Sequence, residues 1–301
     1  NAQDVDFVCS GSCDYLQGAA FAFVEGLSAL ATVPPIKESH VEMDAAWALY
    51  EALLKVWIGE AELCLVYGFG KSSPGELRTV MSLQLDPYYH VPLWPDSISL
   101  AALQARAMLD NGVIGERDMA EVVARSRANA QSNPNAQLKG NPGIEQLLAE
   151  PTFVSPLRRH DCPPITDGAS AARYCKRPAW VRGIDHRMET GIIGARDLTR
   201  SPSTRIAGEK AGVALGKVDL AELHAPFSHQ EIVLRRELGL ADSVPVNLSG
   251  GALSGNTMMA AGLDRIGYVA TQIIGGKADR GVAHATSGPC LQQNLVAVLE
   301  A

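Results

Sequence analysis

Residues 40–69 of the chain, HVEMDAAWALYEALLKVWIGEAELCLVYGF, contain in succession the patterns of a strand, a helix and a second strand. Polar and apolar side chains alternate in residues 40–44, as in a strand with one buried face. Residues 45–58 carry apolar side chains at helical spacing, and Asp44 precedes them as the expected N-cap. Residues 62–69 form an apolar run short enough for a buried strand. This order favours an α/β fold.

The alternation of strand and helix patterns continues on both sides of this stretch. Residues 5–9 have strand character, and residues 19–30 are apolar almost all round, as in a buried helix. Beyond residue 166 we expect strands at 180–184, 218–223, 280–287 and 293–299 and helices at 203–214, 229–238 and 257–275. Together these patterns predict helices that cover mostly parallel strands.

Residues 72–164 differ from both flanks because they hold ten of the 17 prolines of the chain. Helical patterns at 97–111 and 116–131 lie inside this segment, separated by a turn-forming Asn-Gly pair. We interpret the segment as an insertion into the main fold that covers a site or an interface.

Composition excludes several classes of protein. The 301 residues, 47% of them hydrophobic, suffice for one large domain or two smaller ones. The net charge of −7 disfavours a nucleic-acid-binding protein, which needs clustered lysine and arginine. No apolar run reaches the roughly 18 residues of a membrane-spanning helix. Six cysteines are too few for a disulfide scaffold, so we expect a reducing, cytoplasmic location.

Two patterns that suggest ligand sites fail on their spacing. Residues 68–72 lack the earlier glycine of a phosphate-binding loop, because position 65 is leucine. His40, Glu42 and Asp44 fall on one face of a strand but lack the paired histidines or cysteines of a metal site. We therefore expect a polar strand face that ends in a helix cap, and no metal site.

Three segments in the last third carry polar residues where α/β sheets place ligand chemistry. His224 follows a strand directly, and residues 284–290 form a turn between strands that begins with a second histidine. Residues 247–256 are a glycine-rich loop that leads into a helix. Its backbone N–H groups, with the helix dipole behind them, could hold an oxyanion or an acyl carbonyl. For each segment alone, a structural turn is the simpler interpretation.

Five segments, taken in order, resemble the thiolase superfamily, in particular thiolases of the sterol-carrier-protein type and the related lipid-transfer proteins. Residues 41–50 resemble the strand, turn and helix that carry the family nucleophile, and residues 59–71 the strand that follows. Residues 156–172 are similar to the end of the first half of that fold. Residues 222–228, ELHAPFS, resemble the family's strand with its HDCF element, and residues 247–262 its Gly-His-Pro loop and helix.

The resemblance implies an α/β fold of five layers, αβαβα, built from two similar βαβαβαββ halves. The halves would span residues 1–175 and 176–301, with the insertion at about 72–164 in the first. Because the family fold opens with a strand and a helix before the segment that residues 5–9 resemble, we expect the first half to lack its start at Asn1.

The departures from the family pattern bear on the chemistry. The family nucleophile is a cysteine at a helix N-terminus, and the matching position is Ala45. The histidine of the Gly-His-Pro loop is replaced by Asn256, and the cysteine of the HDCF element by Pro226. His224 keeps its matching position, and His284 lies near the last catalytic loop, with Cys290 close by in sequence.

Three functions fit this pattern. Some thiolase-like lipid-transfer proteins are retro-aldolases that cleave steroid side-chain thioesters without the family cysteine. In that case His224 or His284 is the base and Asn256, with the glycine-rich loop, binds the enolate. The second function is a non-catalytic subunit that binds acyl-CoA or lipid, or serves as a scaffold. The third is an acyltransferase that uses Cys290. The candidate substrate-binding residues are Ser249, Gly250, Gly251, Ser287 and Gly288.

The resemblance also implies ligands and partners. A coenzyme A thioester would be the substrate or ligand, and no covalently bound cofactor is expected. The family is dimeric, so we expect a homodimer. The retro-aldolase relatives work with a small partner protein, which predicts a zinc-ribbon or OB-fold partner for this chain too.

Overall fold

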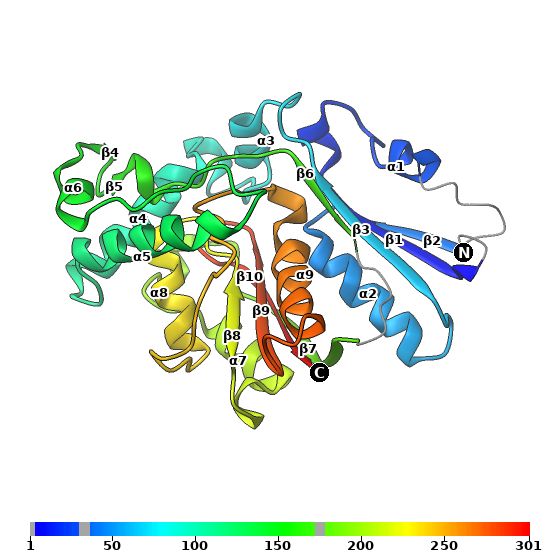
Figure 1. Ribbon diagram of the computed structural model, residues 1–301. Helices are drawn as coiled ribbons and strands as arrows, with labels where there is room; N and C mark the ends of the chain where they lie inside the picture. Colours follow the sequence, from blue (N-terminus) through cyan, green and yellow to red (C-terminus); the bar gives the residue numbers. More distant parts are fainter. Residues whose placement is uncertain (1–3, 30–36, 172–177) are drawn as a thin grey trace.

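The computed structural model describes residues 4–29, 37–171 and 178–301 (Figure 1). The expected boundary between halves at 175 and 176 lies outside these residues. The first sheet, in the order β2-β1-β3-β6, consists of β1 (Phe7–Gly11), β2 (Lys37–Val41), β3 (Cys64–Gly70) and β6 (Gly168–Ala171). The second, in the order β7-β10-β9-β8, consists of β7 (Trp180–Met188), β8 (Leu220–Leu223), β9 (Arg280–Ser287) and β10 (Gln293–Glu300).

Helices lie between the two sheets, on their outer faces and in the insertion. They are α1 (Val24–Ala29), α2 (Ala45–Trp57), α3 (Leu77–Leu83), α4 (Ser97–Asp110), α5 (Glu116–Asn129), α6 (Ile144–Ala149), α7 (Pro202–Ala211), α8 (Ser228–Glu237) and α9 (Ala261–Ile274). A small hairpin of β4 (Thr152–Val154) and β5 (Leu157–Arg158) lies in the insertion. Among the described residues, no helix combines the length and apolar character needed to cross a membrane.

The two sheets differ in strand direction. In the first, β1 runs parallel to β2 and β3, and only β6 is antiparallel. In the second, β8 and β9 are parallel, but β10 is antiparallel to both β9 and β7. Strands β7, β8 and β9 therefore run in one direction, and β10, between β7 and β9, is the strand of the second sheet that runs against them. Only residues 288–292 connect β9 to β10, and so short a connection can join only antiparallel strands.

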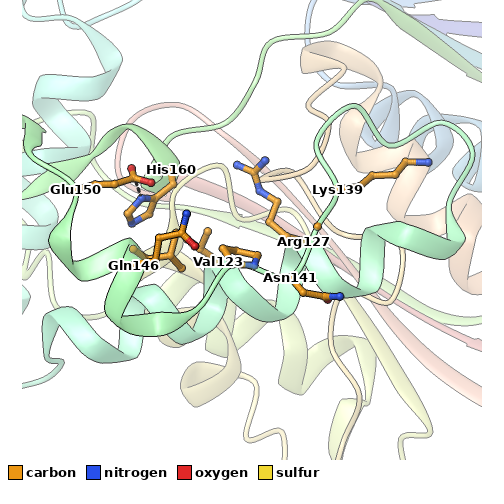
Figure 2. Close-up of a pocket in the computed structure, with 10 residues that line it drawn as sticks. Val123, Arg127, Lys139, Asn141, Gln146, Glu150 and His160 are labelled. Atoms are coloured by element: carbon orange, nitrogen blue, oxygen red, sulfur yellow. Dashed lines mark hydrogen bonds and ion pairs between the residues drawn. The ribbon is translucent and has the colours of Figure 1, made fainter.

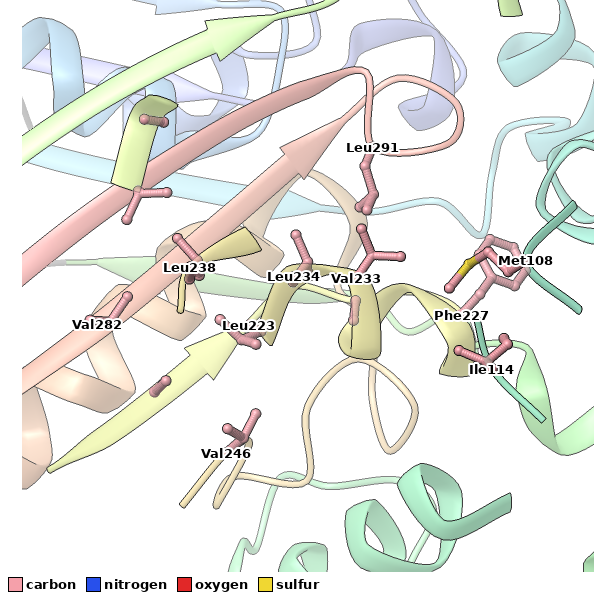
Figure 3. Packing of buried hydrophobic residues seen from close by; sticks show 14 of the residues in the cluster. Met108, Ile114, Leu223, Phe227, Val233, Leu234, Leu238, Val246, Val282 and Leu291 are labelled. Carbon is pink, nitrogen blue, oxygen red and sulfur yellow. The ribbon is translucent and has the colours of Figure 1, made fainter. Parts of the chain in front are cut away.

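The elements stack in five layers, as expected from the resemblance. Helices α2 and α9 lie side by side between the two sheets (Figure 1). Helices α7 and α8 cover the outer face of the second sheet, where Leu223 packs with Val233 and Leu234 (Figure 3). Helix α1 lies over the outer face of the first sheet, where Gly26 contacts the ring of Tyr67. The fold is α/β with the layer order αβαβα.

A single buried carboxylate joins the two helices of the middle layer. Asp44 Oδ1 accepts a hydrogen bond from Ala46 N at 2.8 Å, so Asp44 is the N-cap of α2, as the sequence predicts. Its other oxygen accepts from Gly262 N, in the first turn of α9, at 2.6 Å. A Cβ at Gly262 would lie 2.4 Å from Asp44 Oδ1, so glycine is required there. Burial raises the pKa of Asp44 to about 7.

Residues 19–30 do not form the buried helix that their composition predicts. Helix α1 begins only at Val24, the side chain of Phe21 is 73% exposed, and position 30 lies outside the described residues. The carboxylate of Asp14 accepts hydrogen bonds from Phe21 N at 2.5 Å and Phe23 N at 3.3 Å. These bonds hold residues 18–23 in a turn and delay the start of the helix.

The proline-rich insertion covers the second half of the fold. Its helices α4 and α5 occupy the residues that the periodicity predicts, to within two positions. Met108 of α4 and Met119 of α5 are buried in the cluster that contains Val233 of α8 (Figure 3). Further along, Ser228 Oγ at the start of α8 donates to Asp161 Oδ1 at 2.6 Å. The insertion is therefore packed against the loops that follow β8.

Candidate active site

His224 follows the last residue of β8 and faces Asn256. Its Nε2 lies 3.3 Å from Asn256 Oδ1, and Thr286 N donates to its Nδ1 at 3.5 Å. Because Nδ1 is an acceptor in this arrangement, the proton of the neutral ring is on Nε2, and the ring donates to Asn256. Burial, with a further contribution from Arg265, lowers the pKa of His224 to about 3. The ring is therefore neutral at physiological pH.

Asn256 is held by the end of the insertion. Its backbone N–H donates to Pro164 O at 3.1 Å, and its carbonyl accepts from Thr166 N at 2.9 Å. Its side-chain Nδ2 donates to the sulfur of Met258 at 3.7 Å, a weak acceptor. The amide therefore has a donor that a ligand oxygen could take over. The structure brings His224 and Asn256 together, as the sequence analysis supposed.

His284 belongs to a different environment. It lies inside β9, not in a turn, and its Nε2 pairs with Asn294 Oδ1 at 2.9 Å. Its neighbour on the same face of the strand, Val282, packs with the α8 side of the second sheet, whereas Ala283 and Ala285 pack with α9. Its carbonyl accepts from His224 N at 3.2 Å. Burial lowers the pKa of His284 to about 4. No hydrogen bond among the described residues joins the ring of His284 to Asn256.

The donors of the glycine-rich loop are already used within the protein. Ser249 N donates to Glu222 Oε1 at 2.9 Å, Gly250 N to Asn247 O at 2.9 Å, and Gly251 N to Ser249 Oγ at 3.1 Å. These three N–H groups are therefore occupied within the protein, and the binding of an oxyanion by the loop stays a prediction. Buried Glu222 accounts for the occupied donors of Ser249, because a buried carboxylate requires hydrogen-bond donors.

Glu222 and Arg265 were missed by the sequence analysis. Both are buried, and Arg265 Nη1 lies 3.6 Å from Glu222 Oε2 and 3.0 Å from Ser249 Oγ. The only signal in the sequence is a charged residue inside each of two apolar segments, LAEL at 220–223 and GLDRIG at 262–267. This ion pair fixes the glycine-rich loop between β8 and α9.

Cys290 lies apart from the histidines in an apolar cluster with Leu85, Leu100 and Ile193. Its thiol donates to Leu100 O at 3.3 Å, and burial raises the pKa of the thiol to about 12. A thiol in such surroundings is a poor nucleophile. Ser287 ends β9, half-buried, and Gly288 takes a left-handed φ of 73° in the turn that follows.

Ala45 is the first residue of α2 and is fully buried. A Cβ at Gly68 would lie 2.1 Å from the Ala45 Cβ, so the alanine side chain is directed at the first sheet. The helix N-terminus itself carries Asp44, Ala45 and Ala46, none of them a nucleophile of the thiol or hydroxyl type. The assignment of the family nucleophile to Ala45 stays a prediction.

A pocket of about 370 Å³ lies on the insertion (Figure 2). Its lining consists of Val123, Arg127, Lys139, Gly140, Asn141, Pro142, Gln146, Leu147, Glu150 and His160. The Nε of Arg127 is buried and has no hydrogen-bond partner among the described residues. Glu150 is paired with His160, Nδ1 to Oε2 at 2.8 Å, which leaves Arg127 and Lys139 as an excess of positive charge.

The pocket is connected to the His224–Asn256 pair through one short loop. Gln137 N and Leu138 N donate to Ser254 O at 2.8 and 3.0 Å, and Lys139 and Gly140 follow directly as pocket residues. Ser254 is two residues from Asn256. The loop 137–140 thus links the pocket to the segment that carries Asn256.

No protein-family model matches the chain. Its sequence is 30% identical to the acetyl-CoA acetyltransferase of Methanothermobacter thermautotrophicus over 63% of this chain and 58% of that protein. It is 25% identical to the acetyl-CoA acetyltransferase of Methanocaldococcus jannaschii over 91% of the chain and 80% of that protein. For human sterol carrier protein 2 the identity is 25% over 87% of the chain and 56% of that protein. The match thus spans just over half the length of the first and third of these relatives.

Solved structures show the same fold. The structure of human mitochondrial 3-ketoacyl-CoA thiolase superposes with a TM-score of 0.78 at 15% identity, over 100% of this chain and 88% of that one. The Ltp2-ChsH2(DUF35) aldolase superposes with a TM-score of 0.78 at 18% identity, with the same coverage. The chain therefore has the thiolase fold, and its sequence is similar to that of archaeal acetyl-CoA acetyltransferases and of sterol carrier protein 2.

Proposed function

We propose that this protein binds coenzyme A thioesters of lipid or steroid acids and cleaves a carbon–carbon bond in β-hydroxyacyl-CoA substrates by a retro-aldol reaction. The observation that carries the proposal is the His224–Asn256 pair. The pair brings two neutral N–H groups to one buried place: His224 Nε2, which donates to Asn256 Oδ1 in this structure, and Asn256 Nδ2, which donates to the weakly accepting sulfur of Met258. In the proposal a thioester oxygen takes over both donors. Two such donors suit the oxygen of a thioester that becomes negative during the reaction.

The proposed reaction needs no nucleophile. The β-hydroxyl loses its proton, its oxygen forms a carbonyl with the β-carbon, and the bond between the α- and β-carbons breaks. The electron pair of that bond forms the thioester enolate, whose oxygen is held by His224 and Asn256. A proton then adds to the α-carbon, so the products are a shortened acyl-CoA and an aldehyde or ketone. Asn256 suits this role because an amide donates a hydrogen bond without exchanging a proton.

We propose that water, and not a histidine, accepts the proton of the β-hydroxyl. His224 uses Nδ1 to accept from Thr286, and its pKa of about 3 makes it a weak base. His284 faces the other side of the second sheet and has a pKa of about 4. The neutral ring of His224 is thus better suited to donate to an enolate than to remove a proton, as in enzymes where a low pKa keeps an imidazole neutral.

The pocket at Arg127 and Lys139 is the proposed site for the phosphate groups of coenzyme A. Arginine and lysine are the side chains that bind phosphate, and Arg127 Nε has no hydrogen-bond partner among the described residues. The loop 137–140 leads from this pocket toward Asn256. Coenzyme A chemistry is also named for the acetyl-CoA acetyltransferases that the chain resembles.

A non-catalytic binding or scaffold subunit is the second candidate. The near-complete burial of His224 and Asn256, 5% and 3% exposed, favours it, because a substrate must first open this place. Acyl transfer by Cys290 is not proposed, since its thiol has a pKa of about 12 and donates to Leu100 O.

The assembly that we propose is a homodimer with a small zinc-ribbon or OB-fold partner in the cytoplasm. The aldolase with the same fold is named as a complex of two proteins, which supports the partner. All five cysteines among the described residues are free thiols, which suits a reducing compartment.

The test uses the full chain, alone and with the product of any adjacent gene that encodes such a partner. Each preparation is incubated with β-hydroxyacyl-CoA, and free aldehyde or ketone is measured. We expect release by the wild type and a loss of at least about 100-fold in His224→Ala, because this change removes one oxyanion donor and such a donor contributes that much. Binding of the thioester without release in any combination would favour the non-catalytic subunit. Cys290→Ala serves as the control and is expected to keep its activity.

A further inference from the structure

We propose that Asp14, His40 and Glu42 form a binding site for a divalent transition-metal ion such as Zn²⁺. One side-chain atom from each residue can be chosen so that all three lie within 4.8 Å of one another. One imidazole nitrogen and two carboxylate oxygens are ligands that zinc accepts in proteins. The proposal does not depend on the retro-aldol reaction.

The three residues meet at the carboxyl ends of two neighbouring parallel strands. Asp14 opens a short 3₁₀ turn (Asp14–Gln17) just after β1. His40 is the last but one residue of β2, and Glu42 follows that strand. Strand register places His40 directly opposite Ser10 of β1. The carboxyl edge of parallel strands is where α/β folds place ligand sites.

His40 is oriented as metal-binding histidines are. Its Nδ1 lies 2.8 Å from Oγ of Ser10, which is fully buried. The hydroxyl of Ser10 can accept the Nδ1 proton, which leaves the lone pair of Nε2 for a metal. The ring of Phe23 stacks on the imidazole at a centroid distance of 4.2 Å and fixes its plane.

The spacing of the candidate ligand atoms matches a shared metal ion, and the carboxylate of Asp14, which accepts from Phe21 N and Phe23 N, keeps lone pairs for it. His40 Nε2 and Glu42 Oε2 are 3.2 Å apart. Two ligands at about 2.0–2.2 Å from a tetrahedral zinc ion are separated by roughly 3.3 Å. An ion can therefore replace the direct contact of these two side chains with little movement. Three protein ligands, with Glu42 on the surface, leave a coordination position for water.

The charges at the site also favour a cation. Among the described residues, no lysine or arginine forms an ion pair with Asp14 or Glu42, and His40 is the partner of Glu42. A hydrogen bond from Asp14 N to Glu42 Oε1, 2.9 Å long, holds the Glu42 side chain close to Asp14. A divalent ion would offset the repulsion between two carboxylates held this close.

The sequence groups His40 and Glu42 with Asp44, and the proposal replaces the expectation of no metal site with a different set of ligands. Asp44 turns away to cap α2 and to contact Gly262 of α9. Asp14 takes its place, although it lies 26 residues before His40 in the sequence. Only the pairing of β1 with β2 brings the two together.

The test is titration of the chelator-treated full chain with Zn²⁺ by calorimetry, with Co²⁺ absorption as a second measurement. We expect one ion per chain and the absorption bands of four-coordinate Co²⁺. His40→Ala is expected to abolish binding, and Ser10→Ala to weaken it by about 10- to 100-fold, as for other residues that orient a metal ligand. Glu42→Gln keeps an oxygen for Asp14 N, so it is expected to fold and to lose most of the affinity.

His160→Gln is the matched control, because His160 also pairs with a glutamate, Glu150. It is expected to bind Zn²⁺ like the wild type. The proposal is overturned if the wild type binds no Zn²⁺, or if Glu42→Gln binds it as tightly as the wild type does. Circular dichroism spectra of each variant establish that it is folded.

Discussion

The Nε2 atom of His224 lies 3.3 Å from the Oδ1 atom of Asn256, and both side chains are buried where the loop after β8 meets the segment before α9. This contact joins residues 32 positions apart. It also defines the protonation of the ring, since Nδ1 accepts from Thr286. The proposed chemistry depends on the two N–H donors that meet here.

Replacing Asn256 tests the amide donor without changing the size of the side chain. In Asn256→Asp the Nδ2 donor is lost and a carboxylate faces the developing enolate. We expect kcat to fall by about 100- to 1,000-fold, as for other lost oxyanion donors. Steady-state kinetics on β-hydroxyacyl-CoA measure this. The control is Asn111→Asp, whose amide donates to Ala107 O on an exposed turn, and unchanged kcat in Asn256→Asp would refute the assignment.

The pH dependence of the reaction separates a donor from a base. Because burial lowers the pKa of His224 to about 3, we expect kcat/KM to show no histidine ionisation between pH 5 and 8. A rate profile over this range measures it. An acid limb near pH 6.5 that disappears in His224→Gln would mean that His224 is the base after all.

The stability of the fold at acid pH depends on His229 of α8, which is buried beside Gln104 of α4. Burial lowers the pKa of His229 to about 3, so its contribution is complete above the unfolded value of about 6.5 and is lost as the pH falls toward 3. Below pH 6.5, the free energy of unfolding of the wild type should fall with pH more steeply than that of His229→Gln. We expect the two slopes to differ by about 1.4 kcal/mol per pH unit. Urea unfolding at pH 7 and pH 5 measures the difference. An identical pH dependence in the variant and the wild type would contradict the neutral, buried state of this ring.

Asp44 is expected to contribute more stability than an ordinary helix cap, because its carboxylate serves α2 and α9 together. We expect Asp44→Ala to lower the free energy of unfolding by about 2–3 kcal/mol, against about 1 kcal/mol for a single cap. Asp96→Ala is the matched comparison, since Asp96 caps α4 through Ser99 N at 2.7 Å and its other oxygen pairs only with the exposed Arg78 among the described residues. Equal losses in the two variants would show that the contact with Gly262 adds nothing.

Arg127 is expected to determine the affinity for coenzyme A. A charged hydrogen bond contributes about 1.5 kcal/mol or more, so Arg127→Ala should weaken CoA binding at least about tenfold. Calorimetry with CoA measures it, with Arg106→Ala as the control, because Arg106 pairs with Asp110 on the exposed side of α4. If Arg127→Ala bound CoA normally, the phosphates would have to lie elsewhere.

The sequence predicts the elements whose patterns are local. Helix α2 follows from its periodicity and from Asp44, and α4 and α5 follow from theirs. The antiparallel pairing of β10 with β9 was also within reach of the sequence, because only residues 288–292 separate the two expected strands and so short a connection joins only antiparallel strands. The sequence could not show where residues 19–30 pack, because the bonds from Phe21 and Phe23 to Asp14 are outside any helical pattern.

The candidate site could be predicted only in part, because some of its contacts join residues that are far apart in the sequence. His224 and Asn256 stand out through the order of the segments that resemble the thiolase superfamily. The sequence does not show that Ser249 of the glycine-rich loop donates to Glu222, 27 residues earlier, because only the folded chain brings the two together. His284 was expected in a turn near the candidate site. Its position in β9 instead directs its side chain to the face of the second sheet that carries Val282.

The most direct measurement is the ratio of products in a single turnover of the full protein, with its partner, on a β-hydroxyacyl-CoA. We expect one aldehyde or ketone for each shortened acyl-CoA from the wild type, and neither product from His224→Ala within the same time. Shortened acyl-CoA without the carbonyl product, or equal yields of both from the wild type and His224→Ala, would contradict the role of the His224–Asn256 pair.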